Sequence, residues 1–478
     1  MKHRLLFSAL LCLLLWALAG CRAAVPTNAE AGSPSTAAAD DSAPQLTARE
    51  GQTAASGGLL RTRAYPLENG DEVQFGSLCA EADLQAGTVL YTAAVRSGTL
   101  HLYTPELGWQ TLLLTEGTYS GTLFVLDGQE GSWMAYLPQS WELLENVSRR
   151  HLDCGTLRVQ AVPEGFELSL CAPAMDRGNV ADFTVVQAPD ARLLDWTYPN
   201  CEALWSGYSN SGDGRWCYDG YYWPAPSTYL PHGEQVYYRM PLPYLCRSFL
   251  GVASVYRLAD DLAPCMIDTM LLQQNELGFF PTYSESTWLS EDYKIPSGFY
   301  DTRFNTDLAE ILNNAWARYQ FPQFGQALQR YAAFFVSYAE AHHRETASGG
   351  WFVDDYYHPS GNLPTHTSLN HQLAEILLLY HLSDSLQDPQ LSALADRMLL
   401  AITDTTASWI QPNSNLHYAV YPDGSYGGLD YPYLTYNDLY AVQKELEARR
   451  GSRDPGLDRL MANKKLWMDA NGITGYRS

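Results

Sequence analysis

Two segments of the sequence concentrate residue types that could bind or transform a sugar. Residues 350–382 read GWFVDDYYHPSGNLPTHTSLNHQLAEILLLYHL, and residues 413–439 read NSNLHYAVYPDGSYGGLDYPYLTYNDL. Tyrosine and tryptophan offer flat apolar faces with a polar tip, which suits contact with sugar rings. The adjacent Asp354 and Asp355 could act as a general acid/base pair. Adjacent carboxylates point in different directions, however, so a solvated loop or Ca²⁺ ligation explains them equally well.

These two segments resemble the C-terminal domain of the glucuronyl C-5 epimerase family. The family has a stretch Trp-aromatic-x-acid-Tyr-Pro, then a proline, then Leu-Asn at the head of an apolar helix that ends in Leu-Tyr-x-Leu. Its second stretch runs Tyr-Asp-Leu-Arg, a gap, and Asp-Tyr, followed six residues later by Asn and two further on by Leu. The matching residues here are Trp351, Phe352, Asp354, Asp355, Tyr356, Pro364, Leu369, Asn370, Leu379, Tyr380 and Leu382, then Tyr418–Tyr421, Asp430, Tyr431, Asn437 and Leu439. The resemblance covers about residues 240–450.

The resemblance implies an α/α toroid and a reaction that removes the proton beside the carboxylate of a uronic acid. That carbon is a weak acid, so an enzyme needs a base in reach and a cation or hydrogen-bond donors on the carboxylate. A tyrosine can be the base if positive charge lowers its pKa from about 10. By resemblance, Tyr418 and Tyr431 would transfer protons in epimerisation or lyase-type elimination, and Tyr356 would support the substrate. The other substrate-binding residues expected are Trp351, Asn370, Tyr421, Asp355 and Arg303.

The chain departs from the family pattern where the cation should be. Tyr421 stands in place of the arginine that would hold the carboxylate, and Pro432–Thr435 replace a histidine-containing run. A neutral or differently substituted glycan is also easier to reconcile with the acidic chain than a polyanion. The residues that could substitute for the missing groups are Arg303, Arg344, His366, His371 and His417.

The same residues are also compatible with other functions. The tyrosines could only stack on sugars or fill a cleft floor, which would make the protein a non-catalytic glycan-binding lipoprotein or a structural envelope component. Asn370 stands where a helix begins, so a hydrogen-bonding role at the helix terminus is expected there. A glycoside hydrolase would need two carboxylates about 5–10 Å apart. Its candidates are Asp301, Asp354, Asp355 and Asp430.

The elements that must position these residues are helical from about residue 240. In residues 324–343 the apolar side chains recur at three- and four-residue spacing, which predicts an amphipathic helix. Helical pairs joined by long aromatic loops favour an α/α toroid over residues 240–478, although a plain helical bundle gives a similar pattern. The predicted helices are Tyr244–Ala259, Pro264–Gln274, Thr306–Tyr319, Phe324–His343, Ser368–Leu382, Pro389–Thr403 and one from Tyr433 to Arg449.

Before the helical region the pattern is that of β-structure. Residues 59–195 contain short segments rich in Val, Leu, Thr and Tyr, punctuated by Gly, Asp and Pro, which predicts a sandwich-like domain. Residues 196–239 are aromatic and glycine-rich without a period, and are expected to be an irregular connection. The predicted fold is therefore α+β and multidomain.

The N-terminus predicts export and a lipid anchor. Residues 1–20 have a basic start and an apolar run too short to span a bilayer, as in a signal peptide. Leu18-Ala19-Gly20-Cys21 matches the bacterial lipobox, so Cys21 is expected to carry the lipid. Two acyl chains on one residue give lasting anchorage. Residues 21–58 read as a flexible tether. The predicted location is the outer side of a bacterial membrane.

The composition limits the classes of partner that the protein is expected to bind. The net charge of −23 repels phosphate backbones, so nucleic-acid binding is not expected. The sequence contains no CxxC or HExxH motif, no P-loop and no dinucleotide fingerprint, so neither a metal nor a cofactor is predicted. The expected partners are a glycan or polysaccharide and, through Cys21, the lipid bilayer; the oligomeric state is left open.

Overall fold

The computed structural model describes residues 44–55 and 57–477, which divide into two compact units. The N-terminal unit comprises residues 44–273 with 283–285, and the C-terminal unit comprises residues 274–282 with those from 286 onward. The predicted signal segment, Cys21 and most of the tether lie outside the described residues. The boundary predicted at residue 240 falls inside the N-terminal unit. Among the described residues, no helix has the length and apolarity needed to cross a membrane.

Antiparallel strands fill the N-terminal half, as the sequence predicts. A twelve-stranded sheet follows the order β1-β2-β3-β13-β9-β10-β17-β15-β14, with β5, β6 and β8 branching from β9, and a four-stranded sheet follows β4-β12-β11-β7. The strands are β1 (Arg49–Ala55), β2 (Gly58–Pro66), β3 (Glu72–Ala80), β4 (Val89–Val95), β5 (Gly98–Thr104), β6 (Gly108–Leu113), β7 (Gly117–Ser120), β8 (Leu123–Gly128), β9 (Gly131–Leu144), β10 (Ser148–Cys154), β11 (Thr156–Val162), β12 (Gly165–Cys171), β13 (Val180–Ala188), β14 (Arg215–Cys217), β15 (Gly220–Pro224), β16 (Tyr229–Leu230) and β17 (Val236–Arg239).

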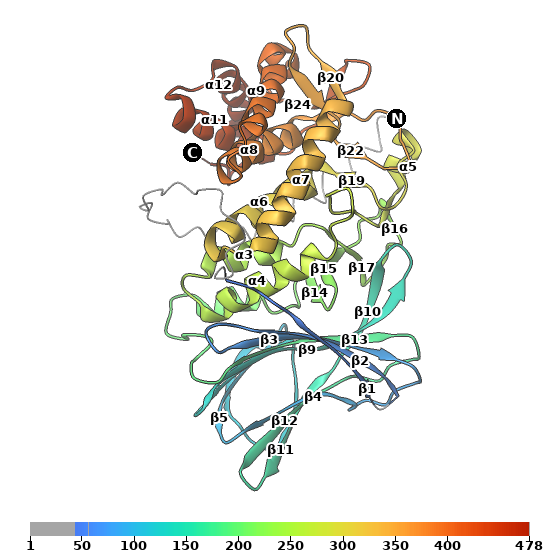
Figure 1. Ribbon diagram of the computed structural model, residues 1–478, viewed down its shortest axis with the longest axis vertical. Helices are drawn as coiled ribbons and strands as arrows, with labels where there is room; N and C mark the ends of the chain where they lie inside the picture. Colours follow the sequence, from blue (N-terminus) through green and yellow to red (C-terminus); the bar gives the residue numbers. More distant parts are fainter. Residues whose placement is uncertain (1–43, 56, 478) are drawn as a thin grey trace. The chain divides into compact units, whose positions relative to one another are not determined.

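The two sheets share one core. Along β11, Leu157 and Val159 are buried while Arg158 and Gln160 point away, because successive strand residues face opposite sides. These side chains join the same buried cluster as Phe183 of β13 in the larger sheet. Figure 1 shows β4, β11 and β12 as a layer facing β3, β9 and β13. This two-layer arrangement agrees with the sandwich-like domain predicted for residues 59–195.

Residues 196–239 are ordered rather than irregular. They contain α2 (Cys201–Gly207), and their strands β14, β15 and β17 extend the large sheet. The aromatic side chains Tyr222 and Tyr237 are buried there in a cluster with Trp141. Two helices complete the unit, α3 (Tyr244–Val252) and α4 (Arg257–Leu271). Pro264 lies inside α4, although the sequence pattern predicts it at a helix start.

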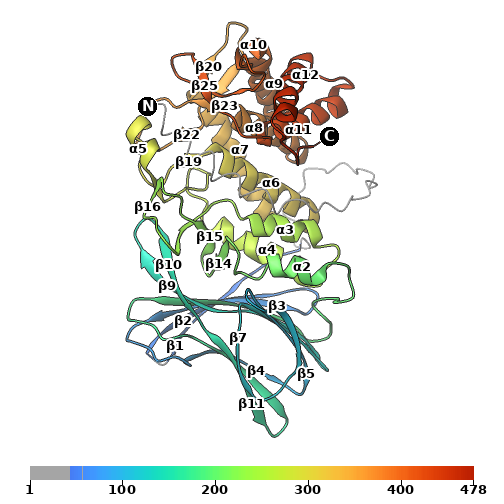
Figure 2. The ribbon, with the colours of Figure 1, turned by 180° about the vertical axis from the view of Figure 1, so that it is seen from behind.

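The C-terminal unit is built from helical hairpins. Helices α6, α8 and α11 contact one another in series, and α7, α9 and α12 each pair with the preceding helix of that series. Figures 1 and 2 show the α8, α9, α11 and α12 hairpins side by side. The helices are α5 (Thr287–Tyr293), α6 (Thr302–Tyr319), α7 (Pro322–Ala341), α8 (Leu369–Ser385), α9 (Pro389–Asp404), α10 (Thr406–Trp409), α11 (Leu434–Arg450) and α12 (Pro455–Ala470). This two-layer array agrees with the predicted helical pairs, whereas closure into a toroid stays a prediction.

Helix α8 is the centre of the array. It contacts α6, α7, α9 and α11, and its residues are buried on almost every side, so the run LAEILLLYHL needs no polar face. The segments that lead into α6, α8 and α11 contain short strand pairs rather than plain loops. These strands are β18 (Glu285–Ser286), β19 (Tyr300–Asp301), β20 (His343–Glu345), β21 (Trp351–Val353), β22 (Tyr356–Tyr357), β23 (Thr367–Ser368), β24 (His417–Val420) and β25 (Tyr426–Leu429).

Candidate functional site

A buried aspartate stands at the start of each helix in the α6, α8 and α11 series. Asp301 caps α6 by accepting a hydrogen bond from the Phe304 amide at 3.0 Å. Asp355 accepts the amide of Ser368, the residue before α8, at 3.0 Å and its hydroxyl at 2.5 Å. Asp430 accepts the hydroxyl of Thr435 in α11 at 2.5 Å. Helix N-termini favour nearby negative charge, which suits carboxylates at these positions.

The strand pairs bring these helix starts together with the predicted site residues. β19 pairs with β22, so Asp301 lies opposite Tyr356. β23 pairs with β24, so Ser368 lies opposite Ala419, next to Tyr418. The segment before α6, the segment before α8 and the segment before α11 therefore converge.

His366 lies at the centre of this convergence. Its ring is surrounded by aromatic rings whose centroids all lie within 6.1 Å, and these belong to Trp288, Tyr293, Tyr356, Tyr418 and Tyr421. We call His366 and these side chains the His366 group. His366 and Tyr356 are buried, whereas the other members are half-buried. The group thus has a buried polar centre and a rim that is partly open.

His366 makes a hydrogen bond through Nδ1, whereas its Nε2 makes none within the described residues. Nδ1 lies 2.8 Å from the hydroxyl of Tyr293, and Nε2 lies 3.3 Å from Asp355 Oδ2. The same carboxylate oxygen lies 3.6 Å from Nδ1 of His371, which also contacts the Thr302 hydroxyl at 2.6 Å. Burial, with a smaller contribution from the charge of Arg344, lowers the pKa of His366 to about 3. At neutral pH the imidazole of His366 is therefore uncharged.

The phenols Tyr418, Tyr421 and Tyr431 come from β24 and the segments that follow it. The rings of Tyr418 and Tyr431 pack edge to face with centroids 5.9 Å apart, and both are half-buried. Glycines opposite β24 make room for them. A Cβ on Gly428, whose φ is +83°, would come within 2.8 Å of the Tyr418 Cβ, and one on Gly427 would meet the Tyr421 ring at 3.1 Å.

A buried lysine fixes the backbone of Tyr431. Lys464 of α12 is fully buried and donates to the Tyr431 carbonyl at 2.7 Å and to Asn415 Oδ1 at 2.7 Å. Its Nζ lies 2.6 Å from Asp430 Oδ2. A buried charge is stable only with such partners. The ion pair therefore ties α12 to the start of α11 and to the position of Tyr431.

Two arginines differ in how many of their guanidinium nitrogens have a hydrogen-bond or ion-pair partner. Arg303 is committed to an ion pair with Asp438 at 2.8 Å, which links α6 to α11, and to one with Asp307 at 3.2 Å within α6. Arg344 of β20 donates from Nη2 to the Thr367 hydroxyl at 2.8 Å and to the Val420 carbonyl at 3.2 Å. Its Nε and Nη1 are buried and have no hydrogen-bond partner among the described residues. Arg344 therefore brings partly unused positive charge to the strand that carries Tyr418.

Buried carboxyls near the group hold their protons more tightly than usual. Burial raises the pKa of Asp354 to about 7, opposed by Arg344 and by the Thr365 amide, which donates to it at 3.2 Å. Burial likewise raises the pKa of Asp301 to about 7. Burial raises the pKa of Asp355, opposed by its hydrogen bonds from Ser368. Burial also raises the pKa of Tyr293 and of Tyr421, so both phenols are neutral at physiological pH.

The structure places most predicted site residues together. Tyr356, Tyr418 and Tyr421 belong to the His366 group, Asp355 contacts its imidazole, and Tyr431 joins through Tyr418. Asn370 lies in the first turn of α8, where its backbone carbonyl accepts from Arg303 at 3.3 Å and its side-chain oxygen is buried without a hydrogen-bond partner. It does not cap the helix, because Ser368 is the N-cap residue.

Trp351 lies outside the group. His343 stacks on its ring with centroids 3.7 Å apart, and the guanidinium of Arg397 lies 4.4 Å from the ring centroid. Neighbours therefore cover the indole faces that a sugar would need. The sequence analysis did not single out three residues that contribute to the site: Trp288, Tyr293 and Lys464. The first two lie in a segment whose aromatic content stood out, whereas Lys464 shows no signal, because α12 has an ordinary polar sequence.

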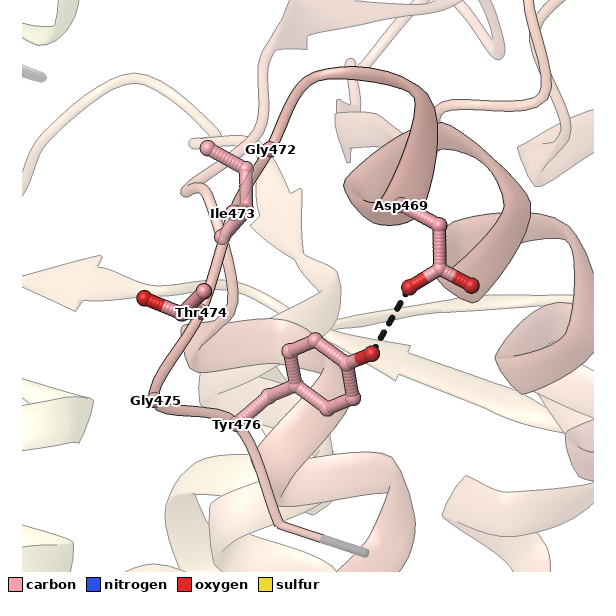
Figure 3. Close-up of a pocket in the computed structure, with 6 residues that line it drawn as sticks. All are labelled: Asp469, Gly472, Ile473, Thr474, Gly475 and Tyr476. Atoms are coloured by element: carbon pink, nitrogen blue, oxygen red, sulfur yellow. Dashed lines mark hydrogen bonds between the residues drawn. The ribbon is translucent and has the colours of Figure 1, made fainter.

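Neither a metal site nor the hollow at the C-terminal end of the chain coincides with the His366 group. No cluster of three or more His, Cys, Asp or Glu side chains within residues 44–55 and 57–477 is placed to hold a metal ion. A surface hollow of about 490 Å³ is lined by Asp469, Gly472–Gly475 and Tyr476, whose hydroxyl donates to Asp469 at 2.7 Å (Figure 3). It shares no residue with the His366 group.

Comparison with known proteins gives only distant structural likeness. No family model and no curated protein sequence matches the chain. A D-mannose isomerase structure is 14% identical with a TM-score of 0.35 over 48% of this chain and 59% of its own. Cellobiose 2-epimerase from Spirochaeta thermophila is 15% identical with a TM-score of 0.34 over 47% and 56%. The GH76 α-mannanase BT2949 of Bacteroides thetaiotaomicron is 15% identical with a TM-score of 0.34 over 48% and 59%. The chain thus spans less than two thirds of each, and a likeness this weak assigns neither family nor activity.

Proposed function

We propose that the C-terminal unit is a carbohydrate-active domain that acts by abstracting a proton from a sugar carbon beside a carboxylate, as an epimerase does. The observation that carries the proposal is the His366 group itself. Partly open phenols from β24 and α5 surround an uncharged, buried imidazole that a carboxylate holds in place. Phenols, an imidazole and a nearby cation are the groups that this chemistry needs.

Arg344 supports the choice of an acidic sugar. The chain lacks an arginine at residue 421, but Arg344 reaches the backbone of Val420 from β20. Its Nε and Nη1, which have no hydrogen-bond partner among the described residues, are donors suited to a carboxylate, because guanidinium groups pair with carboxylates in a planar fork. Positive charge at this point would stabilise the negative charge that develops on the sugar.

The contact between Tyr418 and Tyr431 limits how a sugar could bind. Because the two rings touch edge to face, no sugar ring fits between them. A sugar would instead lie across their outer edges, with one of its faces toward His366. Epimerisation needs a second proton donor on the opposite face of the carbon, and elimination does not.

The test is solvent exchange at the sugar carbon. The full chain is incubated in deuterated water with a panel of uronic-acid-containing oligosaccharides and polysaccharides, and with neutral glycans as the comparison. NMR reads deuterium at C5, and ultraviolet absorbance reads unsaturated product. We expect exchange with at least one uronate and none with neutral glycans. Neither exchange nor elimination across the panel would contradict the proposal.

A second candidate is a non-catalytic glycan receptor. The raised pKa of Tyr293 and of Tyr421 favours it, since neutral phenols bind sugars well but are weak bases. Isothermal titration separates the two functions. A receptor would bind a glycan with wild-type affinity in the Tyr418→Phe variant and show no turnover in any form.

We propose as well that the chain is a lipoprotein on the outer side of a bacterial membrane, anchored through Cys21. The lipobox Leu18–Cys21 and the apolar run before it support this. In a bacterial host, radiolabelled palmitate should enter the wild-type chain and the membrane fraction should contain it. The Cys21→Ser variant should lose both properties. Equal labelling of the two would overturn the anchor.

A further inference from the structure

We propose that Tyr293, His366 and Asp355 form a proton relay in which Tyr293 is the group that takes the proton from the substrate. The Tyr293 hydroxyl lies 2.8 Å from His366 Nδ1, and Nε2 of the same ring lies 3.3 Å from Asp355 Oδ2. This inference rests on the proposed function, because it supplies the base that proton abstraction requires.

The neighbours of the two ring nitrogens of His366 favour one tautomer. Nε2 makes no hydrogen bond to the described residues, and Asp355 Oδ2 lies 3.3 Å from it, so we assign the ring proton to Nε2, where it faces the carboxyl group. Nδ1 is then the acceptor and receives the Tyr293 hydroxyl. This leaves the lone pairs of the Tyr293 oxygen free to accept another proton. A hydroxyl, an imidazole and a carboxylate in this order form the arrangement that activates a weak nucleophile or base.

The proton transfer balances without a resting phenolate. The C–H bond of the sugar breaks, and its proton forms a bond to the Tyr293 oxygen. The proton that Tyr293 held moves to Nδ1 of His366, and an ionised Asp355 would offset part of the cost that burial imposes on the imidazolium. The electron pair of the broken C–H bond stays on the sugar beside its carboxylate. The relay therefore gives the phenol proton a path to His366 without a resting phenolate at Tyr293.

A second branch on the same carboxylate shows why the Tyr293 branch is the one that acts. His371 Nδ1 contacts the Thr302 hydroxyl and lies near Asp355, which repeats the pattern of hydroxyl, imidazole and carboxylate. Thr302 is buried in the first turn of α6, so no substrate reaches it. Tyr293 ends α5 and is half-buried, at the rim of the His366 group. Of the two hydroxyl groups, only that of Tyr293 is therefore placed where a substrate can reach it.

The backbone around the relay is held in place. The Leu363 amide donates to the Tyr293 carbonyl at 2.9 Å, and the Asp355 amide donates to the His366 carbonyl at 3.0 Å. The Thr367 hydroxyl donates to the Val353 carbonyl at 2.7 Å. These bonds join the end of α5 to the segment that carries His366. Such fixed geometry is what catalysis by positioned groups requires.

The relay can be tested without knowing the sugar, by labelling the full chain with phenylmethanesulfonyl fluoride. In this reaction the phenol oxygen forms an S–O bond, the S–F bond breaks and fluoride leaves, and the phenol proton passes to His366 and then to water. Peptide mass spectrometry gives the rate at each tyrosine. Tyr421 is the internal control, because it is half-buried and borders the same imidazole without a hydrogen bond to it.

We expect Tyr293 to react about a hundredfold faster than Tyr421 at pH 7, within the range that a positioned base contributes. Its rate should be nearly constant from pH 6 to 8, whereas an ordinary phenol gains about tenfold per pH unit. The His366→Gln variant should bring Tyr293 to the Tyr421 rate and leave Tyr421 unchanged, which also reports that the fold is intact. Equal rates in the wild type, or a tenfold rise per pH unit at Tyr293, would overturn the relay. Fast labelling without sugar exchange would keep the relay and reject the proposed substrate.

Discussion

The imidazole Nε2 of His366 lies 3.3 Å from Oδ2 of Asp355, and both side chains are buried. The two residues belong to one short segment, and the hydrogen bond between the Asp355 amide and the His366 carbonyl folds that segment back on itself. This backbone bond holds the two side chains next to each other. The pair gives the C-terminal unit a fixed polar centre around which the phenols are arranged.

Gly428 sets the position of Tyr418. The Gly428→Ala variant should be less stable by about 2–4 kcal/mol, since a left-handed alanine costs about 1–2 kcal/mol and the added Cβ also clashes with Tyr418. Gly424→Ala is the matched control, because Gly424 has a similar φ of +81° and nothing within 4 Å of the added Cβ. Urea unfolding should rank Gly428→Ala well below Gly424→Ala. Equal losses would mean that Gly428 makes no room for the phenol.

Removing one partner of the Lys464–Asp430 ion pair should destabilise the folded protein. Replacing Lys464 with Met leaves a buried carboxylate without its cation, and we expect a loss of about 3–5 kcal/mol in the free energy of unfolding. The double variant Lys464→Met with Asp430→Asn removes both charges and should recover most of that loss. If the double variant is no more stable than the single one, the charge pair does not hold Tyr431 in place.

The sequence predicts the helices and the tyrosine segments well, because both depend on local patterns. Of the stripe that the spacing predicts, Leu328, Tyr331, Phe335 and Tyr338 are buried and Phe334 is half-buried. The segments around Tyr356 and Tyr418, which carry the resemblance to the epimerase family, lie close together in the structure. These features require only periodicity and motif, which one chain displays.

What the sequence does not predict depends on contacts between distant segments. Lys464 reaches Tyr431 across 33 residues, and Tyr293 reaches His366 across 73. Arg303 is taken up by Asp307 and Asp438, and Trp351 is covered by His343 and Arg397. Whether such side chains are free to bind a substrate is decided by tertiary neighbours, which spacing alone does not specify.

Glu375 should make the protein lose stability as the pH rises. Burial raises the pKa of this carboxyl to about 8, so the folded protein keeps a proton that the unfolded chain loses above its ordinary pKa of about 4.5. The stabilisation is complete below that value and is lost as the pH approaches 8. Between pH 6.5 and 7.5, the Glu375→Gln variant should lose about 1 kcal/mol less in free energy of unfolding than the wild type.

Comparing wild type with the Glu375→Gln variant isolates the contribution of one titratable group. The pKa of Asp261 is also raised to about 8 by burial, but that residue is unchanged in the variant. The pKa of the buried imidazole of His366 is lowered to about 3, and because His366 is also unchanged in the variant its contribution is the same in both proteins. Urea unfolding at the two pH values is the measurement. Parallel losses in variant and wild type would show that Glu375 is ionised in the folded state at neutral pH.

The central claim is that Tyr418 and Tyr431 belong to a site that removes a proton from a sugar carbon. The direct measurement is the rate of deuterium incorporation at C5 of a uronate in the full chain and in the Tyr418→Phe, Tyr431→Phe and Tyr476→Phe variants, the last being a phenol outside the His366 group. We predict a fall of about a hundredfold or more for the first two and no change for Tyr476→Phe. Exchange at the wild-type rate in both Tyr418→Phe and Tyr431→Phe, or none in the wild type with any uronate, would contradict the claim.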